Sequence, residues 1–307
     1  MSVMSPQRAL LLIHRNMRIR SGWSKHLLSG PSTLPYHPSG PCIPRLALVS
    51  NPVRALSSEA PTGPGWGTPT ADNDRYDNLH VTFRDGVRTI TFNRPEKKNA
   101  LTEKMFADVV NALEEAAKDP DTVVTATTGA GNVFCAGNDK TNFQNLTMKQ
   151  VQELLTRHMA AFIDFPKPLI AVVNGAAVGA VFFTPFSSLG ITLEGCSSFT
   201  FPRFMGQAKA YEILMFNKLV TAKEAYDLHL ATKVFPASSL YEEVWPRLQT
   251  MAKLPQKSLI YSKALTRDVI KDRLHKINIE ECKRVTECIM VDKATKEDYD
   301  KYIAENF

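Results

Sequence analysis

The middle of the chain contains a connection too short for most ways of joining two strands. An apolar run typical of a buried strand, Pro168–Asn174, is followed after only six residues by a second apolar run that begins at Val181. A crossover between parallel neighbouring strands needs a dozen or more residues and usually contains a helix. Residues 175–180 cannot hold such a helix, so we expect no crossover helix at this point.

Patterns of strand and helix alternate around this short connection. Leu79–Arg84 and Val87–Phe92 are β-prone runs separated by Asp85-Gly86, which is a strong hairpin signal. The other predicted elements are helices over Glu103–Lys118 (capped by Thr102), Met148–Phe162 and Gln207–Phe216, a helix that opens with a capping box at Thr221, a strand over Thr122–Thr127, and a mostly helical, amphipathic stretch from Leu254 onwards. This alternation favours an α/β or mixed fold.

Basic residues are concentrated at the start of the chain. Residues 1–58 contain seven of the 37 Lys and Arg residues and none of the 31 Asp and Glu residues. They are also rich in Ser and Pro, which is typical of a mitochondrial presequence. The alternative is a tail with no targeting role. The chain ends in Glu305-Asn306-Phe307 and lacks the peroxisomal tripeptide Ser-Lys-Leu, so we expect the mitochondrial matrix.

The rest of the chain is close to neutral, which argues against a nucleic-acid-binding protein. Residues 59–75, rich in Pro, Gly and Thr, are expected to be a linker. No run approaches the roughly 20 apolar residues of a membrane span. No dinucleotide or phosphate-loop motif is present, and the Cys and His residues lack metal-ligand spacing, so we expect no metal site.

Four motifs then occur in a fixed order. They are Asn93-Arg94-Pro95 with Asn99-Ala100-Leu101, then Phe134–Asp139, then Pro166–Ala171 with Val173-Asn174-Gly175, and finally Pro185–Gly190 with Glu194–Ser198. In content and order they resemble the crotonase (enoyl-CoA hydratase/isomerase) superfamily over about residues 76–290. The last motif, with Gly137-Asn138-Asp139, is most similar to the Δ3,Δ2-enoyl-CoA isomerases. The resemblance implies a crotonase-like ββα spiral core over residues 76–250 and a C-terminal helical region over residues 251–307.

This resemblance also implies a reaction. Moving a double bond from C3 to C2 of an acyl thioester requires removal of the Cα proton, and the enolate formed is stabilised by backbone N–H donors at the thioester oxygen. One carboxylate takes the proton and returns it to the far carbon. The resemblance assigns the N–H donors to Asn138 and Ala180 and the base to Glu194. Hydration needs a second carboxylate, and the corresponding position here is Phe183.

Further site residues follow from the same resemblance. The backbone at Lys98, Asn99 and Ala100 is expected to lie along the CoA, with Lys97 and Lys98 either facing its phosphates or simply exposed. The expected substrate-binding loops also include Ala136, Gly137, Asp139 and Gly179. The CoA belongs to the substrate, so no separate cofactor is implied. Members of the superfamily are usually trimers or hexamers, and the same assembly is expected for this chain.

The short connection after Gly179 departs from the family pattern. The family has a helix and a strand here, and this chain lacks roughly 15–20 residues, about the length of a crossover. The fold is therefore expected to lack one helix and one strand, and the helix that orients the Ala180 N–H would be lost or replaced by a turn. Two interpretations remain open: an isomerase that rebuilds its oxyanion hole, or a catalytically silent crotonase-like protein that binds acyl-CoA or associates with other subunits.

Overall fold

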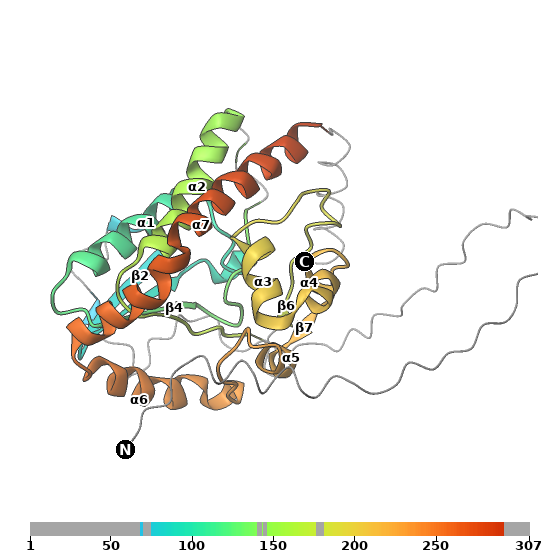
Figure 1. Ribbon diagram of the computed structural model, residues 1–307. Coiled ribbons are helices and arrows are strands. Elements are labelled where there is room, and N and C mark those ends of the chain that lie inside the picture. Colours follow the sequence, from blue (N-terminus) through green and yellow to red (C-terminus); the bar gives the residue numbers. More distant parts are fainter. Residues whose placement is uncertain (1–67, 70–74, 140–142, 144–145, 176–180, 292–307) are drawn as a thin grey trace, which may run out of the picture. The chain divides into compact units, whose positions relative to one another are not determined.

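The computed structural model describes residues 68–69, 75–139, 143, 146–175 and 181–291. These residues belong to one compact unit, Pro52–Phe307, and form a five-stranded sheet, a two-stranded sheet and helices α1 to α7 (Figure 1). The predicted mixed α/β class is therefore confirmed. The predicted presequence, residues 1–58, and most of the predicted linker lie outside the described residues.

The main sheet combines antiparallel and parallel pairing in the order β1-β2-β3-β4-β5. Its strands are β1 (Thr68–Pro69), β2 (Leu79–Arg84), β3 (Val87–Phe92), β4 (Val124–Gly129) and β5 (Leu169–Ala171). The β1-β2 and β2-β3 pairs are antiparallel, while β3-β4 and β4-β5 are parallel. The turn between β2 and β3 has positive φ at both Asp85 (50°) and Gly86 (79°), as the hairpin signal predicts.

Helices cover both faces of this sheet. Helix α1 (Glu103–Lys118) begins where Thr102 accepts a hydrogen bond from Met105 N, as predicted. Its buried face packs with Ile90 of β3 in one core cluster. Val87, three positions before Ile90 and therefore on the opposite face of the strand, packs with Trp245 of α6 (Leu240–Ala252). The alternation along β3 therefore divides the core into two layers.

Helices α2 and α7 lie side by side and run in opposite directions (Figure 1). Helix α2 (Met148–Asp164) begins at its predicted first residue, where Thr147 and Gln150 form a capping box, and α7 (Gln256–Val291) forms the predicted C-terminal helical stretch. Lys263 near the start of α7 donates to Lys167 O beyond the end of α2, and Asn278 further along donates to Thr156 O. The second half of α7 therefore lies beside the first part of α2.

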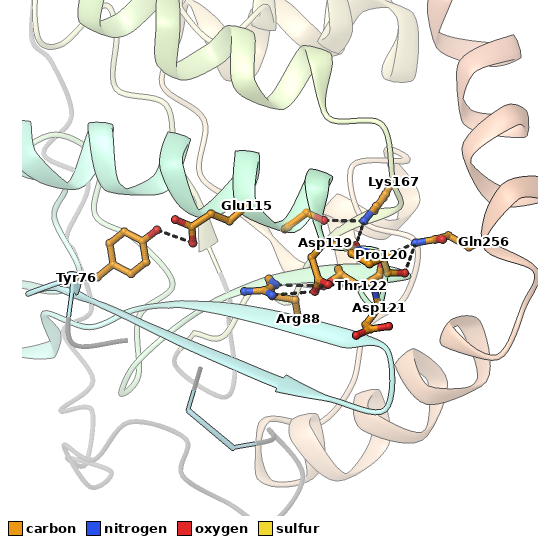
Figure 2. Close-up of polar contacts among 10 residues, drawn as sticks. Tyr76, Arg88, Glu115, Asp119, Pro120, Asp121, Thr122, Lys167 and Gln256 are labelled. Atoms are coloured by element: carbon orange, nitrogen blue, oxygen red, sulfur yellow. Dashed lines mark hydrogen bonds and ion pairs between the residues drawn. The ribbon is translucent and has the colours of Figure 1, made fainter. Parts of the chain in front are cut away.

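The amino ends of the parallel strands are joined by a dense polar network (Figure 2). We call Arg88, Asp119, Thr122, Lys167 and Gln256 the amino-end network. Arg88 of β3 pairs with Asp119 at 2.9 Å and donates to Thr122 at 3.1 Å. Buried Lys167 donates to two carbonyls at the carboxyl end of α1, and Gln256 donates to Thr122 O at 2.8 Å. This network attaches α1, α7 and the approach to β5 to the same edge of the sheet.

The chain beyond β5 does not return to the main sheet in the described residues. Strand β6 (Val181–Phe182) pairs antiparallel with β7 (Val220–Thr221) in a separate sheet. The described residues between β5 and α3 (Ser197–Met205) contain no helix, in agreement with the expectation from the short connection. The remaining elements are the short helices η3 (Pro95–Lys97) and η4 (Ala237–Ser239), with α4 (Gln207–Leu214) and α5 (Ala222–Asp227).

Several boundaries differ from those predicted. Strand β5 has three residues instead of the expected Pro168–Asn174, because its pairing is limited to the three positions opposite β4. Strand β4 begins and ends two residues later than expected. Strand β1 falls inside the predicted linker, where it adds two residues to the edge beside β2. In the first half of α7 the amphipathic pattern is incomplete, since Leu265 and Val269 are 79% and 81% exposed.

Candidate functional site

Three loops leave the parallel strands β3, β4 and β5 at the same edge of the sheet. They begin at Asn93, Ala130 and Val172, and three of the four sequence motifs lie in or next to them. Ligands of such sheets usually bind outside the carboxyl ends of the parallel strands. We call these three segments the carboxyl-end loops.

The loop after β3 is organised around the buried side chain of Asn99. Its Oδ1 accepts from Arg94 N at 2.8 Å, and its Nδ2 donates to the carbonyls of Ala130 and Val133 in the neighbouring loop. Lys98 and Asn99 both have positive φ, 50° and 57°, a conformation that Asn tolerates better than most residues. Asn99 therefore fixes two loops to each other.

The backbone of this loop offers a ligand few free donors. The N–H groups of Lys98, Asn99 and Ala100 donate to Pro95 O, Arg94 O and Lys97 O. A molecule lying along this stretch would therefore meet carbonyl oxygens and the exposed Lys98 side chain. The structure places Lys98, Asn99 and Ala100 together at the carboxyl-end loops. Their contact with CoA stays a prediction.

The loop after β4 folds back tightly on Gly129. A Cβ at Gly129 would lie 2.4 Å from the carbonyl oxygens of Val133 and Phe134, so only glycine fits there. Asn174 from the third loop locks this turn: its Nδ2 donates to Gly129 O and Gly131 O, both at 2.9 Å, and its Oδ1 accepts from Gly129 N at 3.0 Å. Sequence analysis named Asn174 only as part of a motif, and the structure gives its side chain this role.

The predicted oxyanion donor Asn138 lies further along the same loop. Leu101 forms a bridge with it in which Leu101 N donates to Gly137 O at 2.8 Å and Asp139 N donates to Leu101 O at 2.9 Å. In such a bridge the N–H of Asn138 itself points away from Leu101. Among the described residues this N–H has no acceptor.

Two predicted substrate-binding residues on either side have different surroundings. Gly137 has φ of 92°, and a Cβ at this position would meet no atom within 4 Å. Glycine is therefore favoured here by the backbone conformation and not by a lack of space. Asp139 is paired with Arg94 at 2.9 Å, and Arg94 also donates to Ala100 O at 2.7 Å. The carboxylate of Asp139 therefore holds this loop against the first one. Ala136 is exposed and donates to Lys98 O.

The predicted base Glu194 lies in the segment that enters α3. Gly195 (φ 71°) and Cys196 (φ 59°) follow it in left-handed conformations, and Ser197 N donates to Glu194 O at 3.2 Å. Burial of its carboxyl group, and then the neighbouring Glu281 carboxylate, raise the pKa of Glu194 to about 7. The described residues donate no hydrogen bond to its carboxyl oxygens. A carboxyl group of this pKa can exchange a proton near neutral pH.

Not all of the predicted site residues are brought together by described contacts. No hydrogen bond or ion pair in the described parts of the chain joins Glu194 to Asn138. The Glu194 segment packs instead on α2, where Met159 Cε lies 3.7 Å from the Cβ position of Gly195. The predicted Gly179 and Ala180 lie outside the described residues.

A cavity of about 890 Å³ lies along β5 on the side where the chain leaves the sheet. Its apolar lining includes Ile170, Val172, Phe182 and Leu240, with Lys233 among its polar residues. Neither Asn138 nor Glu194 lines it.

Searches for two other kinds of site gave negative results over the described residues. In that part of the chain no group of three or more His, Cys, Asp or Glu side chains could hold a metal ion. No described helix combines the length and the apolar character needed to cross a membrane.

Comparison with protein families gives one match to the chain. The family described as Enoyl-CoA hydratase/isomerase matches residues 82–182 and 179–303. The two matched stretches meet at residues 179–182, which is where the sequence has its short connection. Together they span most of the chain.

Curated relatives include two kinds of enoyl-CoA isomerase. The chain is 46% identical over 249 residues to Enoyl-CoA delta isomerase 2 of Rattus norvegicus, covering 74% of this chain and 63% of the rat protein. It is 42% identical over 268 residues to Enoyl-CoA delta isomerase 2 of Homo sapiens (78% and 68%) and 42% identical over 250 residues to the peroxisomal Enoyl-CoA delta isomerase 3 of Mus musculus (74% and 78%). The chain thus spans less than two thirds of the rat relative.

Solved structures show the same fold. OdaA of Pseudomonas aeruginosa matches with a TM-score of 0.69 and 28% identity, covering 74% of this chain and 99% of that one. An enoyl-CoA hydratase/isomerase from Pseudoalteromonas atlantica matches with a TM-score of 0.69 and 27% identity, covering 75% and 98%. The arrangement of strands and helices described above is therefore the one expected from the sequence motifs.

Proposed function

Because the chain belongs to the enoyl-CoA hydratase/isomerase family, we propose that it converts 3-enoyl-CoA thioesters to 2-trans-enoyl-CoA thioesters, as in fatty-acid β-oxidation. The observation that carries this proposal is the 42–46% identity with the delta isomerases over about three quarters of the chain. The reaction needs one base, and Glu194 supplies a carboxyl group whose pKa of about 7 suits that role.

In the proposed mechanism Glu194 removes a proton from C2 of the substrate. The electron pair of that C–H bond enters the thioester, and the negative charge of the dienolate gathers on the thioester oxygen. The protonated Glu194 then returns the proton to C4, which leaves the double bond between C2 and C3. Substrate and product are isomers, so the step consumes no water, oxidant or cofactor other than the CoA that the substrate already carries.

The dienolate oxygen needs hydrogen-bond donors that are already in place. The N–H of Asn138 is proposed as one donor, since it has no acceptor among the described residues and the Leu101 bridge fixes its direction. Ala180 remains the proposed second donor, with Gly179 beside it in the substrate-binding loop. Asn99, Asn174 and Arg94 would keep the Asn138 loop in place through the contacts described above.

A direct test is to incubate the purified full chain with a 3-enoyl-CoA and identify the product. We expect the 2-trans-enoyl-CoA, and no 3-hydroxyacyl-CoA when the 2-enoyl-CoA is supplied instead, because Phe183 occupies the position expected for the second carboxylate of a hydratase. Acyl-CoA binding without isomerisation would contradict the proposal and favour the catalytically silent protein. The control is the same assay without protein, which measures spontaneous isomerisation.

Residues 1–58 are proposed to direct the protein to the mitochondrial matrix, on the strength of their basic composition without acidic residues. Since one relative is peroxisomal, the test compares the location of a fluorescent protein fused to residues 1–58 with that of the full chain carrying the same tag. The expected trimer or hexamer is tested separately by light scattering of the full chain.

A further inference from the structure

The N-terminus of α3 is capped by a residue from the far end of the chain. Its own N-cap residue, Cys196, supplies no side-chain cap. Glu281 of α7, 85 positions later, accepts from Cys196 N through Oε2 at 2.6 Å and from Ser198 N through Oε1 at 3.0 Å. Both of its oxygens therefore take N–H groups that the first turn of a helix leaves without partners.

Glu281 is held firmly by its surroundings on α7. It is 6% exposed, and Asn278, one turn earlier, is fully buried and donates to Thr156 O of α2 at 2.9 Å. Cys282 contacts Asn278 Oδ1, and Cys196 Sγ lies 3.5 Å from Leu274 O. The face of α7 that carries Glu281 is thus fixed to α2 on one side and to the start of α3 on the other.

These contacts determine the path of the segment that carries Glu194. Cys196 is a non-glycine residue in a left-handed conformation, which costs about 1 kcal/mol or more and needs compensating contacts. The two hydrogen bonds to Glu281 stabilise that conformation, and the charge of the carboxylate also suits the helix N-terminus. Ser197, between the two bonded residues, donates to Glu194 O, so the constraint extends to Glu194 itself.

We propose that Glu281 is a positioning residue for the reaction: its carboxylate fixes the Glu194–Ser198 segment and places a second negative charge beside the Glu194 carboxyl group. The proposal rests on the function of Glu194 proposed above. The role proposed for Glu281 is indirect, because each of its oxygens accepts a backbone N–H of the segment that carries Glu194.

The charge of Glu281 has a consequence for proton transfer. A neighbouring carboxylate disfavours ionisation, so it raises the pKa of Glu194 together with burial. The other titratable groups near Glu194 in the described residues are the thiols of Cys282 on α7 and Cys196 on its own segment. Both thiols have a pKa raised to about 11 by burial, so they stay neutral below pH 9. The residue of α2 that contacts this segment is Met159, which is not titratable. The positive charge of Arg267 on α7 acts in the opposite direction on Cys196, where it lowers the pKa of the thiol.

The test compares three variants of the full chain: Glu281→Gln, Glu281→Asp and Glu280→Gln. Glu281→Gln keeps the shape and removes the charge, whereas Glu281→Asp keeps the charge and shortens the reach. Glu280→Gln is the matched control, because Glu280 is on the same helix and, within the described part of the chain, forms an exposed pair with Arg284. Carbon-13 NMR follows the titration of the Glu194 carboxyl group, assigned by its loss in Glu194→Gln, and kinetics give kcat and KM against pH.

For Glu281→Gln we expect the Glu194 titration, and the acidic limb of kcat/KM, to move down by about one pH unit, with kcat reduced about tenfold and KM little changed. For Glu281→Asp, the acidic limb of kcat/KM should stay near pH 7, and kcat should still be reduced. Glu280→Gln should match the unaltered chain in all readouts. If Glu281→Gln does not fold, the Glu281→Asp result decides the positioning role alone.

A purely structural role would give a different pattern. It would lower the thermal midpoint of both Glu281 variants and leave the Glu194 titration and the kcat of the folded protein unchanged, which would overturn the proposal. Failure of the proposed function is distinguishable, because the NMR titration needs no activity. An inactive chain whose Glu194 titration still moves in Glu281→Gln would refute the isomerase and keep the electrostatic link between Glu281 and Glu194.

Discussion

The two ends of the parallel strands β3, β4 and β5 are built from different chemistry. At the amino end, charged side chains pair with one another and with carbonyls, as in the Arg88–Asp119 pair and in buried Lys167 (Figure 2). At the carboxyl end, the neutral amides of Asn99 and Asn174 hold loops by binding backbone carbonyls, and the Arg94–Asp139 pair joins two of these loops. The N–H of Asn138 is left without an acceptor among the described residues.

Two carboxyl groups, Asp119 of the amino-end network and Glu194 of the segment before α3, have pKa values shifted in opposite directions. Burial alone would raise the pKa of Asp119, but hydrogen bonds from Thr122, Arg88 and the Asp121 backbone outweigh burial and lower it to about 2. Burial and a like charge raise the pKa of Glu194 to about 7. A carboxylate that is fully ionised and paired contributes to stability, whereas one that is half-protonated at neutral pH is suited to proton transfer.

The largest effect is expected for Glu194→Gln. Loss of a general base lowers kcat by about 10²- to 10⁴-fold. Stability should respond in the opposite direction, because a pKa raised from about 4.5 to about 7 means that the folded state loses stability as the pH rises through that window. At pH 8 the variant should therefore be more stable than the original by about 1–3 kcal/mol. Urea unfolding of both proteins at pH 5 and pH 8 measures this difference. Equal stability of the variant and the original protein at pH 8 would contradict the prediction.

At the amino end, Asp119→Ala should lower the free energy of unfolding by about 2–3 kcal/mol, because it removes the carboxylate to which both Arg88 and Thr122 donate. The kcat of the folded protein should not change. Since the lowered pKa of Asp119 contributes stability above about pH 4 that is lost as the pH falls towards 2, the difference between the two proteins should shrink in acid. A matched control is Glu114→Ala, which removes an exposed pair with Lys118. A large loss of kcat in Asp119→Ala would remove the distinction between the two ends.

Asn174→Ala should combine both effects on a smaller scale. It leaves the carbonyls of Gly129 and Gly131 without their donor, which costs about 2 kcal/mol of stability. It also loosens the turn before the Asn138 loop, so kcat should fall several-fold. Asn111→Ala on the exposed side of α1 is the control, with little change expected in either quantity. Stability loss with unchanged kcat would show that the loop does not depend on this amide.

The smallest effect is expected for Lys98→Ala. Lys98 is exposed at the carboxyl-end loops, where the proposed substrate would place the negatively charged phosphates of its CoA. Removing one charged contact should raise KM for the acyl-CoA about three- to tenfold and leave kcat unchanged. The increase should diminish at high salt. Lys118→Ala, at the amino end, serves as the control for a general change of charge, and an equal rise in its KM would contradict a specific contact.

Sequence reasoning predicted best where the signal is local. The bounds of β2, β3 and α1 agree to the residue. Asp85-Gly86 forms the turn between the two strands, and the Thr102 side chain caps α1 by accepting from Met105 N. Helix α3 was not predicted, because it contains Pro202 and its N-terminal cap comes from Glu281. A cap supplied from 85 residues away leaves no pattern in the neighbouring sequence.

The candidate site shows the same limit. The motifs indicated Asn138, Glu194 and the Lys98–Ala100 stretch. The structure places these residues in loops and turns, and their roles stay predictions. The roles of Asn99 and Asn174 depend on loops brought together by the sheet, and sequence alone does not reveal which carbonyls they bind. Glu281 was missed entirely, because Glu280-Glu281 reads as the charged surface of a helix until α7 is docked against α3.

The central claim is that Glu194 is the base of an enoyl-CoA isomerase, and the dependence of kcat/KM on pH tests it most directly. Between pH 5 and 9, with a 3-enoyl-CoA substrate, the full chain should become more active as the pH rises through about 7 and then level off, because only ionised Glu194 accepts a proton. The residual activity of Glu194→Gln should lack this rise. A profile that is flat from pH 5.5 to 8, or a rise through pH 7 that persists in Glu194→Gln, would contradict the account.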